Sequence, residues 1–147
     1  PVAVERDALG VPTIRAATRD DAARALGFLH AQERFFQMDL SRRRAAGELA
    51  ELVGEAAVPL DRATRIHTFR TIAQASLAGL STAERATLDA YTSGVNTGLS
   101  QLRSRPFEYL LLRTAPAPWK PEDSLLVAHA MWLELQDGDA SYERTLS

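Results

Sequence analysis

The first 20 residues place apolar side chains in the manner of two short strands. Val2 and Val4 stand at alternate positions, the segment DALG is typical of a turn, and a period of two resumes over residues 11–15. Pro12 cannot donate a ladder hydrogen bond, so it lies at a sheet edge or at a gap in the pairing. We therefore predict a β-hairpin over residues 2–15.

From residue 20 onward the apolar positions recur at three- and four-residue steps, which predicts helices. The first helix is expected to run from a cap at Asp20 or Asp21 to about Ala46. Its apolar stripe is wide, so we expect burial on more than one side. The stripe contains Ala22, Leu26, Phe28, Leu29, Phe35, Phe36, Met38 and Leu40.

The remaining pattern predicts four more helices. A short one lies between two glycines at residues 48–53, and a longer one covers residues 60–80. The next begins at a capping box, S-T-A-E, and a proline-rich connector separates it from a final helix over residues 121–135. The inward positions expected in the second of these helices are Ile66, Phe69, Ile72 and Ala73.

These elements give a mostly α-helical chain with an N-terminal β-hairpin, in a single segment, residues 1–147, without a second domain. Two strands do not make a stable sheet alone, and several helices have more apolar surface than their neighbours would cover. Two interpretations stay open at this point. The chain is one piece of a larger fold, or it is a self-sufficient helical domain with a surface hairpin.

Composition narrows the function classes. The chain is 46% hydrophobic and 24% charged, with a net charge of −2, which argues against a nucleic-acid partner. The basic segment SRRRAAG, residues 41–47, is interpreted as a solvated helix face. Without cysteine there is no thiolate site. No apolar run reaches the about 18 residues of a membrane span, and we expect no signal peptide.

The segment GFLHAQERFFQMD brings His30, Glu33 and Arg34 close together, but HAQER is not the zinc motif HExxH. His30, His67 and His129 lie on separate predicted helices. Glu33 interrupts the apolar stripe, so we expect a partly buried carboxylate that pairs with an arginine or with backbone amides. It is either an acid with a raised pKa or, as we favour, an ion pair that fixes helix packing.

Four segments, in this order, resemble the α (small) subunit of the penicillin acylase family of N-terminal nucleophile hydrolases. They are VERDALGVPTIRA, DDAARALGFLHAQERFFQMDLSRRRAAGELAELVG, LDAYTSGVN and APWKPEDSLLVAHAMWLELQD. The resemblance implies a precursor that cleaves itself into α and β subunits, and a four-layer αββα sandwich completed by the β subunit. The hairpin would supply edge strands to it.

The resemblance places catalysis outside this chain. In the family the nucleophile is the first residue of the β subunit, usually serine, and its own α-amino group is the base. An α-amine has a pKa of about 7.7–8.0, so no histidine is needed. No catalytic residue is therefore expected in this chain, and His30, Glu33 and Arg34 are given structural roles.

The resemblance also implies a share of the acyl pocket. Met131 and Leu135 match pocket-lining positions one helical turn apart, with Trp132 and Leu133 beside them. Plain core packing is the alternative for each. Glu143, near Asp137 and Asp139, matches a calcium-binding carboxylate of some relatives, although the intervening segment is longer here; a solvated turn is the alternative.

The function expected is hydrolysis of an amide between an acyl group and an amine, in a β-lactam side chain, an N-acyl homoserine lactone or another N-acyl compound. A non-catalytic helical binding module is the alternative. The expected partners are the β subunit of the same precursor and a small N-acyl substrate. The chemistry requires no cofactor, structural calcium is possible, and relatives suggest a periplasmic or secreted enzyme.

Overall fold

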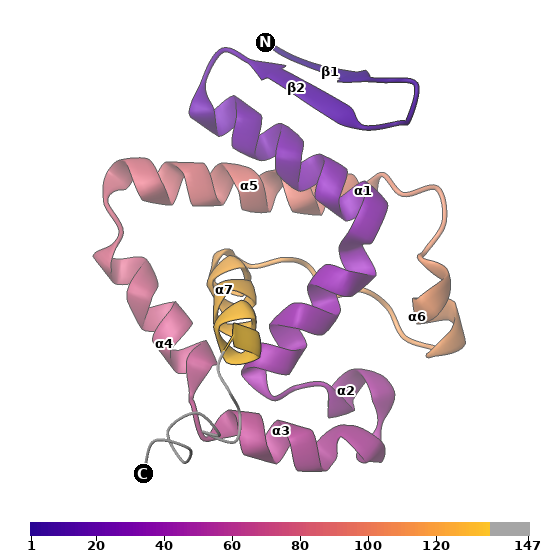
Figure 1. Ribbon diagram of the computed structural model, residues 1–147, viewed down its shortest axis with the longest axis vertical. Helices are drawn as coiled ribbons and strands as arrows, with labels where there is room; N and C mark the ends of the chain where they lie inside the picture. Colours follow the sequence, from indigo (N-terminus) through magenta and orange to yellow (C-terminus); the bar gives the residue numbers. More distant parts are fainter. Residues whose placement is uncertain (136–147) are drawn as a thin grey trace, which may run out of the picture.

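The computed structural model describes residues 1–135 of the 147-residue chain (Figure 1). It confirms a mostly helical chain with an N-terminal hairpin. Two single 3-10 turns, Glu55–Ala57 and Leu77–Gly79, interrupt the helical region. The elements are β1 (Val2–Arg6), β2 (Pro12–Ala16), α1 (Arg19–Ala46), α2 (Ala50–Val53), α3 (Val58–Arg65), α4 (Phe69–Ser76), α5 (Thr82–Ser100), α6 (Phe107–Leu111) and α7 (Pro121–Leu135).

The hairpin forms as predicted. β1 and β2 pair antiparallel, with Val4 opposite Ile14, and Pro12 takes the last pair of the ladder, where its missing N–H costs least. The Asp7 carboxylate accepts hydrogen bonds from two backbone amides of the turn. Every residue of β1 is exposed, so the hairpin buries little of its own apolar surface.

Helix α1 begins slightly earlier than predicted. Its cap is Thr18, whose hydroxyl accepts a hydrogen bond from the Asp21 amide, and the two predicted caps lie in the first turn. The Asp20 carboxylate instead accepts a hydrogen bond from the Thr87 hydroxyl of α5. The helix ends where predicted, at Gly47, whose positive φ of 69° suits a residue without a Cβ.

Glycines allow α1 and α5 to cross in close contact. A Cβ at Gly94 would lie 2.0 Å from the backbone oxygen of Arg24, and one at Gly27 would lie 2.3 Å from that of Tyr91. No side chain fits such a gap, so the two backbones touch directly. The main core follows from this crossing and contains Ala31, Phe35, Leu52, Val95, Tyr109 and Trp119.

The helix predicted over residues 60–80 is wrong in one respect, because it breaks at Thr68. That residue adopts a left-handed conformation, with φ of 51°, between α3 and α4. The break turns Phe69 and Ala73 into the core while Ile66 stays 79% exposed. Ile72, also expected inward, is exposed.

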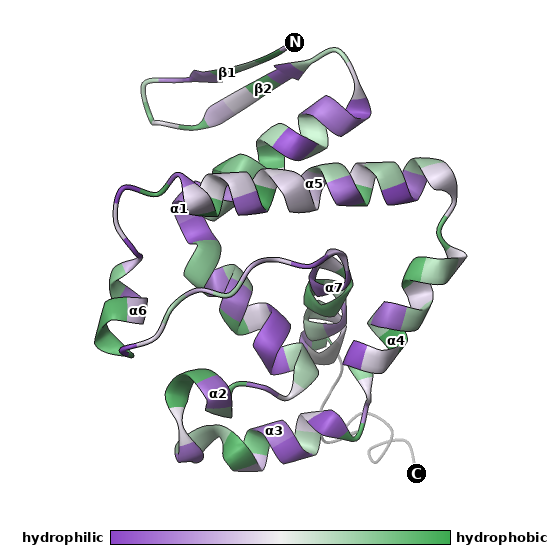
Figure 2. Cartoon of the chain, turned by 180° about the vertical axis from the view of Figure 1, so that it is seen from behind, coloured by the Kyte–Doolittle hydropathy of each residue, from purple (hydrophilic) through white to green (hydrophobic). Residues whose placement is uncertain are grey.

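Helix α7 lies at the centre of a frame made by α1, α3, α4 and α5 (Figure 1), and it contacts α1, α4 and α5. The frame leaves apolar surface uncovered. In Figure 2 the short helix α6, which the sequence pattern did not predict, is largely hydrophobic, and its Phe107, Leu110 and Leu111 are exposed. Within residues 1–135, no helix has both the length and the hydropathy of a membrane span.

Candidate functional site

The fold gives His30, Glu33 and Arg34 of the GFLHAQERFFQMD segment different neighbours. Glu33 is paired with Arg6 of the hairpin, not with Arg34, and its side chain is 32% exposed. This confirms the predicted pairing of a partly buried Glu33 carboxylate with an arginine. Arg34 departs from helical geometry, with φ of −150° and ψ of 29°, and marks a kink in α1. The Glu33–Arg6 pair ties the hairpin to α1.

His30 contacts α5 and not the hairpin. Its Nδ1 lies 2.9 Å from the hydroxyl oxygen of Tyr91, and the two rings meet edge to face. Burial, and then the neighbouring Arg34 charge, lower the pKa of His30, and Glu33 opposes them weakly. Burial also raises the pKa of Tyr91. His30 is therefore favoured as a neutral ring that joins two helices.

A cavity of about 850 Å³ opens beside His30, between α1, α5 and α7. Its walls are mostly apolar, and α1 contributes the polar groups of Arg19, His30, Arg34, Gln37 and Ser41. Such a space, apolar with few polar groups, has the size of a ligand site or of a docking groove. The apolar lining includes Leu26, Met38, Leu88, Trp119, Leu125 and Val127.

The predicted acyl-pocket residues lie on α7 beyond the residues of this helix that line the cavity, which are Ser124, Leu125 and Val127. Val127, Met131 and Leu135 are spaced by four residues and so share one face of the helix. Met131 is 58% exposed and Leu135 is 77% exposed, so core packing explains neither side chain in this chain. Leu133 belongs to the same helix. Glu143 lies outside the described residues, and its calcium role stays a prediction.

Trp132 points to a different neighbour, an aromatic cluster between α4 and α7. Its ring meets Phe69 edge to face, with centroids 5.9 Å apart. His67 and His129 both stack on Phe69, at 5.0 and 4.7 Å. The fold thus unites two histidines that the sequence left apart, in a packing arrangement that fixes the end of α7.

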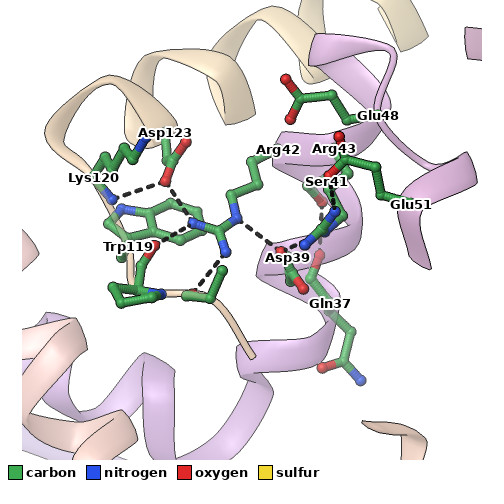
Figure 3. Close-up of polar contacts among 12 residues, drawn as sticks. Gln37, Asp39, Ser41, Arg42, Arg43, Glu48, Glu51, Trp119, Lys120 and Asp123 are labelled. Atoms are coloured by element: carbon green, nitrogen blue, oxygen red, sulfur yellow. Dashed lines mark hydrogen bonds and ion pairs between the residues drawn. The ribbon is translucent and has the colours of Figure 1, made fainter. Parts of the chain in front are cut away.

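The sequence analysis missed a buried network of charged groups around Arg42. The segment SRRRAAG is not a solvated face, because Arg42 is only 5% exposed. Figure 3 shows its guanidinium between Asp39 and Asp123, beside Trp119. Its guanidinium donates to Asp39 at 2.8 Å and to Asp123 at 2.5 Å, and lies 5.0 Å from the ring centre of Trp119. It also donates to two backbone carbonyls of the connector, Ala117 and Pro118.

The two carboxylates of this network have further partners. Asp39 accepts hydrogen bonds from Arg43 and from the Tyr109 hydroxyl, at 3.0 and 2.6 Å. Asp123 accepts one from the Lys120 amide at 2.8 Å and is paired with Arg70. All four carboxylate oxygens are therefore satisfied, which suits a structural network better than a proton-transfer site.

One signal in the sequence could have revealed this network. Asp39, Arg42 and Arg43 have the i, i+3 and i, i+4 spacing of helical ion pairs, inside a stripe of apolar residues. Charges within such a stripe must be paired if the helix is buried. The partner at Asp123 lies 81 residues away and leaves no local trace.

Comparison with known proteins gives a consistent set of relatives. The family model for penicillin amidase matches residues 1–146. The chain is 41% identical over 133 residues to penicillin acylase 2 proenzyme of Pseudomonas sp. (strain SE83). This alignment covers 90% of the present chain and 17% of that protein. The chain is 39% identical over 127 residues to acyl-homoserine lactone acylase QuiP of Pseudomonas aeruginosa, covering 86% of this chain and 15% of that protein.

A solved structure supports the same relationship. Thermostable penicillin G acylase from Alcaligenes faecalis superposes with a TM-score of 0.83 at 32% identity, over 93% of this chain and 75% of that chain. The chain nevertheless spans less than one fifth of the length of the curated relatives above. Most of such a protein lies outside the sequence described here.

Proposed function

The chain belongs to the penicillin amidase family, and on this basis we propose that it is the α-subunit part of an acylase that hydrolyses an amide between an acyl group and an amine. The observation that carries the proposal is the exposed α7 face of Met131 and Leu135, in a chain similar over most of its length to an acylase proenzyme. That face would form one wall of the acyl pocket.

The remaining part of the precursor would supply the chemistry. A serine at its new N-terminus attacks the amide carbonyl, and the hydroxyl proton passes to the serine's own α-amine. The tetrahedral intermediate then collapses, the substrate amine leaves with that proton, and water hydrolyses the acyl ester. The role of the present chain is to shape the pocket, not to transfer protons.

Two substrate classes fit this site. β-Lactam side chains are one, and N-acyl homoserine lactones are the other, suggested by the acyl-homoserine lactone acylase among the relatives. Leu135 presents an aliphatic side chain, which would suit a flexible alkyl chain as well as an aromatic acyl group. Both classes use the same reaction, so an acyl panel separates them.

The test measures amine release by the complete processed enzyme from substrates with phenylacetyl and with straight acyl chains of increasing length. Leu135→Phe should change the ratio of kcat/KM between long and short chains by about tenfold or more, because the larger side chain would shorten the pocket and one methylene in a hydrophobic pocket is worth about 1–3 kcal/mol. Leu111→Phe, on α6 and 75% exposed, is the matched control. If the ranking of substrates is unchanged, Leu135 does not line the acyl pocket. If the enzyme hydrolyses no substrate of the panel, the result would favour a non-catalytic binding module.

Two proposals rest on family resemblance alone. Glu143 would bind a structural calcium ion, and Glu143→Gln would then lower the calcium content of the purified enzyme. We also propose a periplasmic or secreted location, which cell fractionation of the native producer would test.

A further inference from the structure

Two side chains near the end of α7, beside the face of Met131 and Leu135, contact other parts of the chain. The ring of Trp132 meets the rings of Phe69 and His67 edge to face, with centroids 5.9 and 6.4 Å apart. Glu134 forms an ion pair with Arg44, which lies in the last turn of α1. The end of α7 is therefore tied to α4 by an aromatic contact and to α1 by an ionic contact.

These two contacts lie on opposite sides of the Met131–Leu135 face. Successive residues of an α-helix are rotated by about 100°, so Leu135 lies about 40° from Met131 around the axis of α7. Trp132 lies about 100° from Met131 in the same direction, and Glu134 lies about 60° from it in the other. Each contact is thus about 80° from the middle of the face. Rotation of the helix end in either direction would disturb at least one of them.

The two contacts differ in burial. Phe69 is 8% exposed, and its other neighbour on α7 is His129, whose ring stacks on it at 4.7 Å, so it offers Trp132 a fixed surface. The side chains of Arg44 and Glu134 are 43% and 58% exposed, so water screens their attraction. The aromatic contact is therefore the stronger restraint, and the ion pair adds a weaker one on the opposite side.

We propose that Phe69 and Arg44 are positioning residues for the acyl pocket, which act through Trp132 and Glu134 and do not touch the acyl chain themselves. This inference rests on the proposed function, since it takes the Met131–Leu135 face as a wall of that pocket. A small displacement of a group that positions substrate changes rates strongly. Weakening either contact should therefore change the preference of the enzyme among acyl chains, and not only its stability.

Charge reversal of the ion pair is the first test, made in the complete processed enzyme. Arg44→Glu and Glu134→Arg should each change the ratio of kcat/KM between long and short acyl chains by about twofold to fivefold, as expected for an exposed ion pair. The double variant rebuilds the pair with reversed polarity, so its ratio should return toward that of the wild type. Unchanged ratios in the single variants, or a double variant that restores nothing, would overturn the role of Arg44.

A second ion pair of similar exposure provides the control. Arg85 and Asp89 of α5 are 44% and 49% exposed, and they lie on a different helix from the proposed pocket face. Arg85→Glu and Asp89→Arg should leave the ratio unchanged. If they shift it as much as the Arg44 and Glu134 variants do, the effect belongs to surface charge in general and the proposal fails.

Substitution of Phe69 is the second test. Phe69→Leu should change the same ratio by about twofold to tenfold by removing the aromatic ring, whereas Phe69→Tyr keeps the ring and should resemble the wild type. Phe35→Leu is the control, because Phe35 is a buried phenylalanine of the main core, 1% exposed. The ratio does not depend on the fraction of enzyme that is folded, since that fraction multiplies both rates. A wild-type ratio in Phe69→Leu, or the same shift in Phe35→Leu, would show that Phe69 only stabilises the fold.

The Leu135→Phe variant distinguishes failure of this inference from failure of the proposed function. If Leu135→Phe changes the acyl preference and the Phe69 and Arg44 variants do not, the pocket wall stands and the positioning roles are wrong. If the enzyme hydrolyses no substrate of the panel, the proposed function fails and this inference fails with it.

Discussion

Replacing Arg42 by methionine removes the group that joins α1, the proline-rich connector and α7. The guanidinium donates four hydrogen bonds, two to carboxylates and two to backbone carbonyls, and lies against Trp119. Methionine has a similar length and is apolar, so the change deletes the donors with little change in volume. The perturbation therefore isolates the polar contribution of the network.

The expected cost follows from what each partner retains. Asp39 keeps Arg43 and Tyr109, and Asp123 keeps Arg70 and a backbone amide. Loss of one member of a buried ion pair costs about 3–5 kcal/mol, because the other charge stays buried. Since neither carboxylate becomes fully unpaired, we expect the lower part of this range, about 3 kcal/mol.

Pulse proteolysis of the complete enzyme in increasing urea measures this cost, with the intact band of this chain as the signal. Arg62→Met is the matched control, since Arg62 is exposed on α3, and it should change the free energy of unfolding by less than about 0.5 kcal/mol. Arg42→Lys keeps the positive charge but loses the planar guanidinium that donates several hydrogen bonds at once. Its free energy of unfolding should therefore lie between those of Arg42→Met and Arg62→Met. If Arg42→Met and Arg62→Met share one urea midpoint, the network does not stabilise the fold.

The same assay tests three further positions. Gly94→Ala should lower the free energy of unfolding by about 1–3 kcal/mol, because the new Cβ would lie 2.0 Å from a backbone oxygen of α1. Gly79→Ala is the control, since a Cβ there meets nothing within 4 Å. Equal urea midpoints for the two variants would contradict the close crossing of α1 and α5. Tyr109→Phe should lower the free energy of unfolding by about 1.5–3 kcal/mol, because it removes the 2.6 Å hydrogen bond from the Tyr109 hydroxyl to the buried Asp39 carboxylate. A urea midpoint equal to that of the wild type would refute this contribution. The pKa of His30 is lowered by burial and by Arg34, so the unfolded chain binds the proton more readily, and stability should fall as pH drops below about 6.5. His30→Asn should flatten that part of the stability profile, and an unchanged slope would count against the assignment.

The sequence by itself determined the elements that depend on neighbouring residues. The capping box of Ser81 and Glu84 forms as predicted, because both of its hydrogen bonds lie within one turn. The end of α1 at Gly47 and the start of α7 at Pro121 follow from backbone preferences of single residues. The hairpin likewise follows from local alternation and a turn.

Tertiary contacts decided what local patterns leave open. The sequence predicted a cap at Asp20 or Asp21, but the Asp20 carboxylate accepts a hydrogen bond from Thr87 of α5, and Thr18 caps α1. The break at Thr68 accompanies the burial of Phe69 against His129 of α7. Arg42 looked like a surface charge because its partner Asp123 is distant in sequence.

The site shows the same division most clearly. Helical spacing places Val127, Met131 and Leu135 on one face, but it cannot distinguish a face that packs in the core from one that faces another subunit. That distinction depends on which surfaces the rest of the chain covers. Only the folded arrangement shows that Met131 and Leu135 are exposed, because burial is a property of the assembled helices and not of their sequence.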